Sequence, residues 1–85
     1  MQSFTYTIQQ ALGLHARPAG VMVNKLSDTP CSVTVKCGDR SADGKRLLAL
    51  MRMAVKCGDV VTVEIAGDGE DAVAAQLKVF FAENF

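Results

Sequence analysis

The chain has 85 residues, with nine lysines and arginines, nine aspartates and glutamates, and one histidine. This length holds a single domain, residues 1–85, and the 49% hydrophobic content excludes a disordered chain because it is enough to form a core. Zero net charge argues against a general nucleic-acid binder. No apolar run approaches the roughly 18 residues of a membrane span, so we expect no membrane insertion and a cytoplasmic location. We also expect a monomer.

The balanced charge is unevenly distributed along the chain. Eight of the nine basic residues lie within residues 1–56, whereas six of the nine acidic residues lie within residues 57–85. Attraction between the basic part and an acidic protein partner therefore stays open.

The first predicted elements are a strand and a helix. Residues 4–9 alternate between apolar and polar side chains, which is the period of a strand. Residues 16–27 carry an apolar stripe at helical spacing: Ala19, Met22, Val23 and Leu26. The helix should begin close to His15, because Pro18 is tolerated only in a first turn. Gly20, inside this helix, leaves bare surface near its start.

Residues 31–37 alternate again and predict a second strand, with Cys31 and Cys37 on one face. A Gly-Asp turn then leads into a short polar strand at residues 40–42. Cys57 makes the number of cysteines odd, and no CxxC pair or histidine cluster has metal-ligand spacing. We therefore expect reduced thiols, and we predict neither a metal nor a cofactor.

Residues 46–54 form the most informative predicted helix. At roughly 100° per residue, their apolar side chains span an arc of about 220°, well beyond the roughly 100° that a core-facing helix needs. One short helix in so small a domain cannot bury this arc, so part of it should be exposed. The candidates for exposure are Leu47, Leu48 and Met51, within an arc that also includes Leu50, Met53 and Ala54. With Lys45 and Arg52 beside them, they predict a docking patch; the alternative is a helix fully buried under a loop.

A strand and a helix complete the chain. Val60–Ala66 alternates as a long strand, and a Gly-Asp-Gly turn follows, in which Asp68 is the expected N-cap of the last helix. The core face of that helix is predicted to be Val73, Leu77, Phe80 and Phe81. The tetrapeptide Lys-Cys-Gly-Asp occurs twice, and we interpret both copies as turns. The order of elements predicts an α+β domain with helices on one face of an antiparallel or mixed sheet.

The only histidine, His15, lies where the first loop passes into the predicted helix. The unpaired N–H groups and partial positive charge of a helix N-terminus attract an anion such as phosphate. The same positive end favours a neutral imidazole with a free ring nitrogen, as a nucleophile requires. Arg17 adds a forked donor for phosphate oxygens. These features predict a histidine that accepts a phosphoryl group, against the alternative of a histidine that only caps or packs beside the helix.

The sequence Gly-Leu-His-Ala-Arg-Pro-Ala at residues 13–19 resembles the phosphorylation-site motif of HPr, the phosphocarrier family of the bacterial sugar phosphotransferase system. The resemblance extends along the chain through Gly44-Lys45, Leu47-Leu48, Gly58 and Val61-Thr62-Val63. It implies an open-faced sandwich in which three helices cover one face of a four-stranded antiparallel sheet. It also implies a phosphocarrier rather than an enzyme.

By this resemblance, His15 accepts a phosphoryl group on Nδ1 from phosphorylated enzyme I and passes it to sugar-specific enzyme IIA components during sugar uptake. Arg17 and the amides of Ala16 and Arg17 would surround the phosphate. The implied docking surface comprises Gly20, Lys45, Arg46, Leu47, Leu48, Met51 and Arg52.

One position departs from the family pattern. Many HPr proteins, particularly from Gram-positive bacteria, carry a regulatory serine where this chain has Arg46. The kinase-dependent role of that serine is therefore not implied here. Two alternatives stay open: an HPr-like regulatory adaptor, and a carrier in a nitrogen-linked branch without direct sugar transport.

Overall fold

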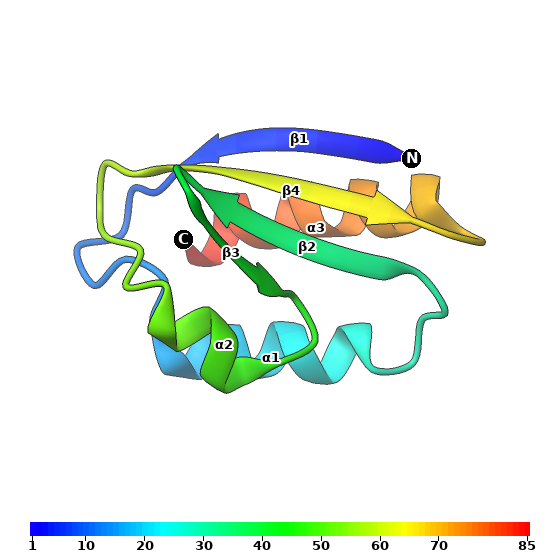
Figure 1. The fold of residues 1–85 in the computed structure, drawn as a ribbon, viewed down its shortest axis with the longest axis horizontal. Helices are drawn as coiled ribbons and strands as arrows, with labels where there is room; N and C mark the ends of the chain where they lie inside the picture. Colours follow the sequence, from blue (N-terminus) through cyan, green and yellow to red (C-terminus); the bar gives the residue numbers. More distant parts are fainter.

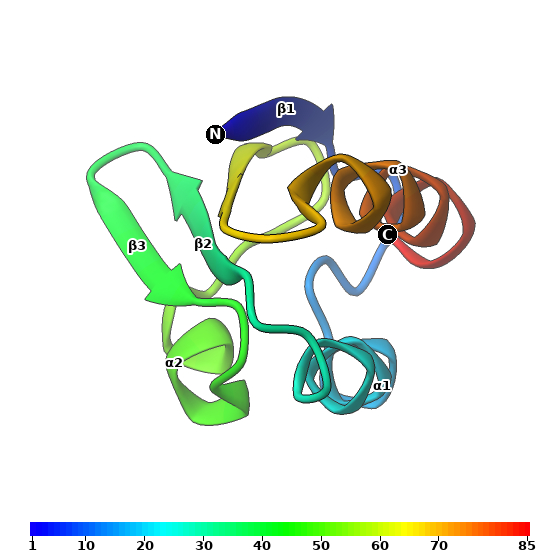
Figure 2. The same cartoon turned by 90° about the vertical axis from the view of Figure 1, so that its right-hand side faces the viewer.

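The alternating segments pair into one four-stranded sheet in the computed structural model, which describes residues 1–85. The strands are β1 (Gln2–Thr7), β2 (Ser32–Cys37), β3 (Arg40–Asp43) and β4 (Val60–Ala66). They run antiparallel in the order β1-β4-β2-β3. The helices are α1 (Ala16–Leu26), α2 (Leu47–Arg52) and α3 (Glu70–Asn84), and all three lie on the same side of the sheet (Figures 1 and 2). This arrangement confirms the predicted fold class.

Apolar and polar side chains alternate along each strand, and the helices cover the face of the sheet that carries the apolar ones. The apolar residues of β2 and β4 are buried beneath the helices: Val33, Val35, Cys37, Val61, Val63 and Ile65. Their polar neighbours lie on the open face, where Lys36 Nζ is 2.9 Å from Glu64 Oε1. The sheet is therefore apolar on one side and hydrated on the other.

The predicted N-cap of α3 is wrong. The cap position is Gly69, which has a φ of +81°, and no side chain caps the helix. Instead, Glu70 Oε1 accepts a hydrogen bond of 3.3 Å from the N–H of Gly67. Glu70 and Asp71 do lie in the first turn, as predicted. Two glycines around Asp68 let the chain turn without help from its carboxylate.

The helix predicted over residues 46–54 is shorter than expected, since α2 ends at Arg52. Ala54, assigned to its apolar stripe, lies outside the helix, is exposed and has a φ of +53°. The chain turns here because Met53 and Val55 both enter the core. The guanidinium of Arg40 donates to the main-chain oxygen of Met53 and so holds the end of the helix.

The cysteines lie as expected. Cys31 and Cys37 are buried on the same face, Cys57 is exposed, and all three are free thiols. Both copies of Lys-Cys-Gly-Asp lie at turns, with φ values of +61° at Gly38 and +91° at Gly58. None of the three helices has the length and apolar character needed to cross a lipid bilayer.

Gly13 lies where the loop after β1 crosses the loop between α2 and β4. Its φ is +67°, and a Cβ atom there would overlap the carbonyl oxygen of Val55 and lie 2.8 Å from Cα of Lys56. The neighbouring N–H of Leu14 donates to the same Val55 oxygen at 3.1 Å. Only glycine permits this close approach of two backbones.

Replacing Gly13→Ala should therefore lower the free energy of unfolding by about 3 kcal/mol or more, because left-handed strain adds to the overlap with Val55. Gly38→Ala is the matched control, since its φ is also positive but nothing lies within 4 Å of its Cβ position. The control should cost only about 1 kcal/mol. Urea unfolding followed by circular dichroism measures both. Equal losses would contradict the close approach.

Candidate functional site

His15 is the N-cap residue of α1, with extended backbone angles of φ −100° and ψ 165°. Its main-chain oxygen accepts the N–H of Ala19 at 3.2 Å, which is the first bond of the helix. Pro18 lies in the first turn, as predicted, and is buried. The sequence therefore located the start of this helix correctly.

The N-terminus of α1 offers unused hydrogen-bond donors. The amides of Ala16 and Arg17 donate to no acceptor within the protein, and the first turn contains no acidic residue. The Arg17 side chain is exposed and forms no ion pair. Two free N–H groups, the positive end of a helix and an unpaired guanidinium together form a setting that stabilises an anion.

The imidazole of His15 is held on two sides. Nδ1 lies 3.0 Å from the carbonyl oxygen of Gly13, and the ring packs edge-to-face against Phe85 with 6.2 Å between centroids. A carbonyl oxygen can only accept a hydrogen bond, so Nδ1 must be the donor in this contact. In the neutral form of the ring, the proton is then on Nδ1 and the free lone pair is on Nε2. An attack by Nδ1 therefore requires the ring first to turn away from Gly13.

The last turn of α3 also borders the site, and no local pattern in the sequence predicts this contact. An open hollow contains His15 and Arg17 from α1 together with Glu83 and Asn84 from α3. The helical spacing of Phe81 and Phe85 was the one available signal, because it extends the core face of α3 to the last residue. Nothing in the sequence indicated that this end lies beside the histidine.

The predicted docking patch is partly exposed, as expected. Leu48 is 72% exposed, whereas Leu47 and Met51 are half-buried against the core. Arg46 and Arg52 border a shallow depression on the same helix. We call this surface of Arg46, Leu47, Leu48, Met51 and Arg52 the α2 patch.

Gly20 lies at the contact between the first two helices. A Cβ atom added to it would lie 4.0 Å from Leu47 Cδ2, so α1 comes close to α2 at this point. Figure 2 shows the two helices side by side beneath the sheet. The structure thus connects the helix that begins at His15 to the helix that carries the α2 patch.

Lys45 does not join the α2 patch. Its Nζ donates to the main-chain oxygen of Thr29 at 2.8 Å, so its ammonium faces the loop after α1. Its own N–H donates to Asp43 Oδ1, and the same carboxylate lies 3.7 Å from Arg46 Nε. Arg52 has no such partner and is the unpaired cation of the patch.

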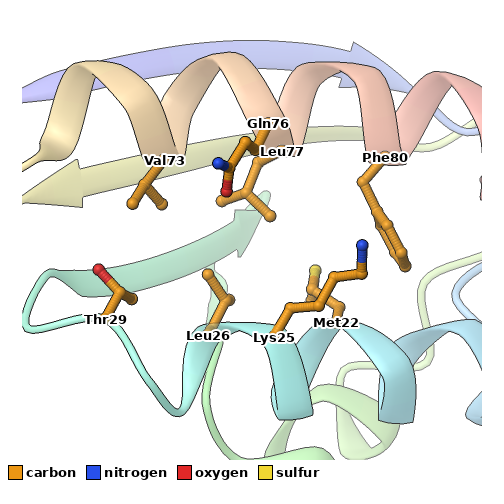
Figure 3. A pocket seen from close by; sticks show the side chains of 8 residues that line it. All are labelled: Met22, Lys25, Leu26, Thr29, Val73, Gln76, Leu77 and Phe80. Atoms are coloured by element: carbon orange, nitrogen blue, oxygen red, sulfur yellow. The ribbon is translucent and has the colours of Figure 1, made fainter.

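A separate cavity lies between α1 and α3, away from the histidine. Figure 3 shows the residues that line it: Met22, Lys25, Leu26, Thr29, Val73, Gln76, Leu77 and Phe80. Lys25 Nζ lies 5.6 Å from the centroid of the Phe80 ring. None of the predicted site residues borders this cavity.

Comparisons with known proteins agree with this geometry. The family model described as PTS HPr component phosphorylation site matches residues 2–83. Phosphocarrier protein HPr of Pseudomonas putida is 37% identical, over 91% of each chain. The multiphosphoryl transfer protein of Xanthomonas campestris is 32% identical over 91% of this chain, which spans only 9% of that larger protein.

The fold has a solved counterpart as well. The histidine-containing phosphocarrier protein of Mycoplasma superposes with a TM-score of 0.92 at 27% identity, over 96% of this chain and 93% of that one. The family match spans nearly every residue, including the helix start around His15. The chain therefore belongs to the HPr family of the phosphotransferase system, whose members are phosphocarrier proteins rather than stand-alone enzymes.

Proposed function

We propose that this chain carries a phosphoryl group on His15 from phosphorylated enzyme I to sugar-specific enzyme IIA proteins during sugar uptake in the cytoplasm. The observation that carries this proposal is the position of the imidazole at the N-terminus of α1. Two unused amides and the unpaired Arg17 lie beside it there. No other side chain in the protein combines a nucleophile with such an anion site.

The transfer itself asks for positioning and charge stabilisation. A ring nitrogen of His15 forms a bond to phosphorus with its lone pair, while the bond from phosphorus to the donor breaks and its electrons stay with the donor. The free amides of Ala16 and Arg17 and the Arg17 guanidinium stabilise the charge on the phosphoryl oxygens. The same step in reverse delivers the group to the next protein.

The family resemblance assigns the reaction to Nδ1, which here donates a hydrogen bond to the carbonyl oxygen of Gly13. A half-turn of the ring about the Cβ–Cγ bond carries Nδ1 away from that carbonyl oxygen. The proton must also move to Nε2, so that Nδ1 has a lone pair for the attack. We therefore propose that the Gly13 contact is the resting state and that it opens before phosphorylation.

We further propose that partner proteins dock on the α2 patch, with Gly20 beside it and Lys45 at its margin. The exposed Leu48 gives this surface an apolar centre, and Arg46 and Arg52 give it a basic border. Such a surface fits a partner with an apolar centre and acidic border. A regulatory adaptor would use the same patch without phosphorylation, so only chemistry at His15 separates the two functions.

Incubation with phosphoenolpyruvate and enzyme I should place one acid-labile phosphoryl group on each chain. His15→Ala should abolish the incorporation, and Arg17→Gln should slow it about tenfold to hundredfold, because one charge-stabilising donor is lost. Radiolabelled phosphate and mass spectrometry measure both effects. Incorporation that survives His15→Ala, or none in the natural protein, would refute the carrier and leave the adaptor.

Docking can be tested through charge. Arg52→Glu should slow phosphorylation by enzyme I about tenfold at low salt, with the loss shrinking as added salt screens the interaction. Lys78→Glu is the matched control, because it makes the same charge change on α3, where Lys78 Nζ lies 6.0 Å from the Phe4 ring centroid. If the two substitutions slowed phosphorylation equally, or if the loss of rate for Arg52→Glu did not change with salt concentration, docking on the α2 patch would be contradicted.

A further inference from the structure

The ring of Phe85 is held firmly on the side of α3. Its side chain is 1% exposed and packs edge-to-face with Phe81 and Phe80, at centroid distances of 5.0 Å and 6.0 Å. This ring also packs edge-to-face against His15, at 6.2 Å and an interplanar angle of 85°. A fixed aromatic ring therefore forms one wall against the imidazole.

The main chain of Phe85 holds the loop that leads to the histidine. Its oxygen accepts the N–H groups of Gln9 at 2.6 Å and Gln10 at 2.8 Å. The oxygen of Gln10 in turn accepts the N–H of Gly13 at 2.9 Å, and the oxygen of Gly13 faces His15 Nδ1. The end of α3 thus reaches the imidazole twice, through its ring and through this series of hydrogen bonds.

We propose that Phe85 is a positioning residue for phosphoryl transfer, which holds the plane of the His15 ring. This inference rests on the proposed function of His15. An edge-to-face contact depends on the planes and centroids of the two rings, not on which ring nitrogen faces which way. A half-turn about Cβ–Cγ preserves the imidazole plane and nearly preserves its centroid. Phe85 can therefore hold the ring both before and after Nδ1 leaves Gly13.

Fixing the plane matters because the attacking lone pair lies in it. A ring that is free to tilt presents this lone pair to phosphorus for only part of the time, whereas a held ring presents it in one direction. An aromatic contact of this kind changes populations by about threefold to tenfold. The effect should fall on the chemical step, because the α2 patch that binds partners lies on another helix.

The test compares Phe85→Leu with Phe80→Leu. Both substitutions remove a ring from the same aromatic cluster, but only Phe85 contacts His15; Phe80 borders the separate cavity (Figure 3). Phe85→Leu should lower kcat for phosphorylation by enzyme I about threefold to tenfold, with KM unchanged within about twofold. Phe80→Leu should change kcat and KM by less than about twofold, because the ring of Phe81 still packs against Phe85 at 5.0 Å. Equal kcat in the two variants would overturn the proposal.

Nuclear magnetic resonance of the unphosphorylated protein tests the positioning separately from the function. Phe85→Leu should shift the His15 ring protons, which lose the ring current of Phe85, and should increase the mobility of the imidazole seen by carbon relaxation. Phe80→Leu should do neither, because Phe81 still packs against Phe85 at 5.0 Å and the Phe85 ring stays beside His15. If the natural protein accepts no phosphate, these spectra still decide whether Phe85 holds the ring; unchanged imidazole mobility in Phe85→Leu would overturn the proposal.

A folding defect must be kept apart from lost positioning. Phe85→Met serves as the second variant, because its flexible thioether fills the space of the ring without an aromatic face. It leaves the main-chain acceptor for Gln9 and Gln10 in place. The amide spectrum reports the fold, and a folded Phe85→Met with the kcat and imidazole mobility of the natural protein would also refute the proposal.

Discussion

The carbonyl oxygen of Val55 is the point on which the site depends. It lies against Gly13, where no side chain fits, and it accepts the N–H of Leu14. Ala54, with a φ of +53°, turns the chain between the end of α2 at Arg52 and this oxygen. The backbone strain at Ala54 is offset by burial of Val55 in the core. Two loops far apart in the sequence are thereby locked together just before His15.

This constraint explains which parts of the site could be predicted from sequence. The helix start at His15 follows from local signals, since Pro18 restricts where the first turn can lie. The end of α2 does not, because the apolar pattern continues through Ala54 and only the tertiary contact of Val55 breaks it. Phe85 was missed for a related reason: helical spacing assigns it to the core, but its contact with His15 joins residues 70 positions apart. The period of the apolar residues identifies the buried face of a helix or strand, but it does not predict which loop contacts which helix end.

Strand pairing also explains how the basic first part and the acidic second part of the chain are arranged in space. Lys36 and Arg40, on β2 and β3, lie beside acidic residues from the second part of the chain, at 2.9 Å from Glu64 and 3.9 Å from Asp59. Pairing of the strands therefore places opposite charges from the two parts of the chain beside each other. Arg17 and Arg52 form no ion pair, so unpaired positive charge remains on the helices. A neutral chain can in this way still present a basic surface to an acidic partner.

A carrier has to contact two partners in turn. In this fold, the residues that hold the histidine are different from the groups that stay free for an incoming phosphoryl group. Phosphoryl transfer needs a nucleophile held in a fixed direction, which burial provides, but it also needs an approach that no protein segment blocks. Here the residues that contact the imidazole, Gly13 and Phe85, are both buried. The groups that we propose to meet the phosphoryl oxygens, the first amides of α1 and Arg17, have no partner within the protein, and Arg17 is exposed. Rigidity and access are compatible because different groups around the imidazole provide them: buried residues contact the ring, and unpaired donors remain for an anion.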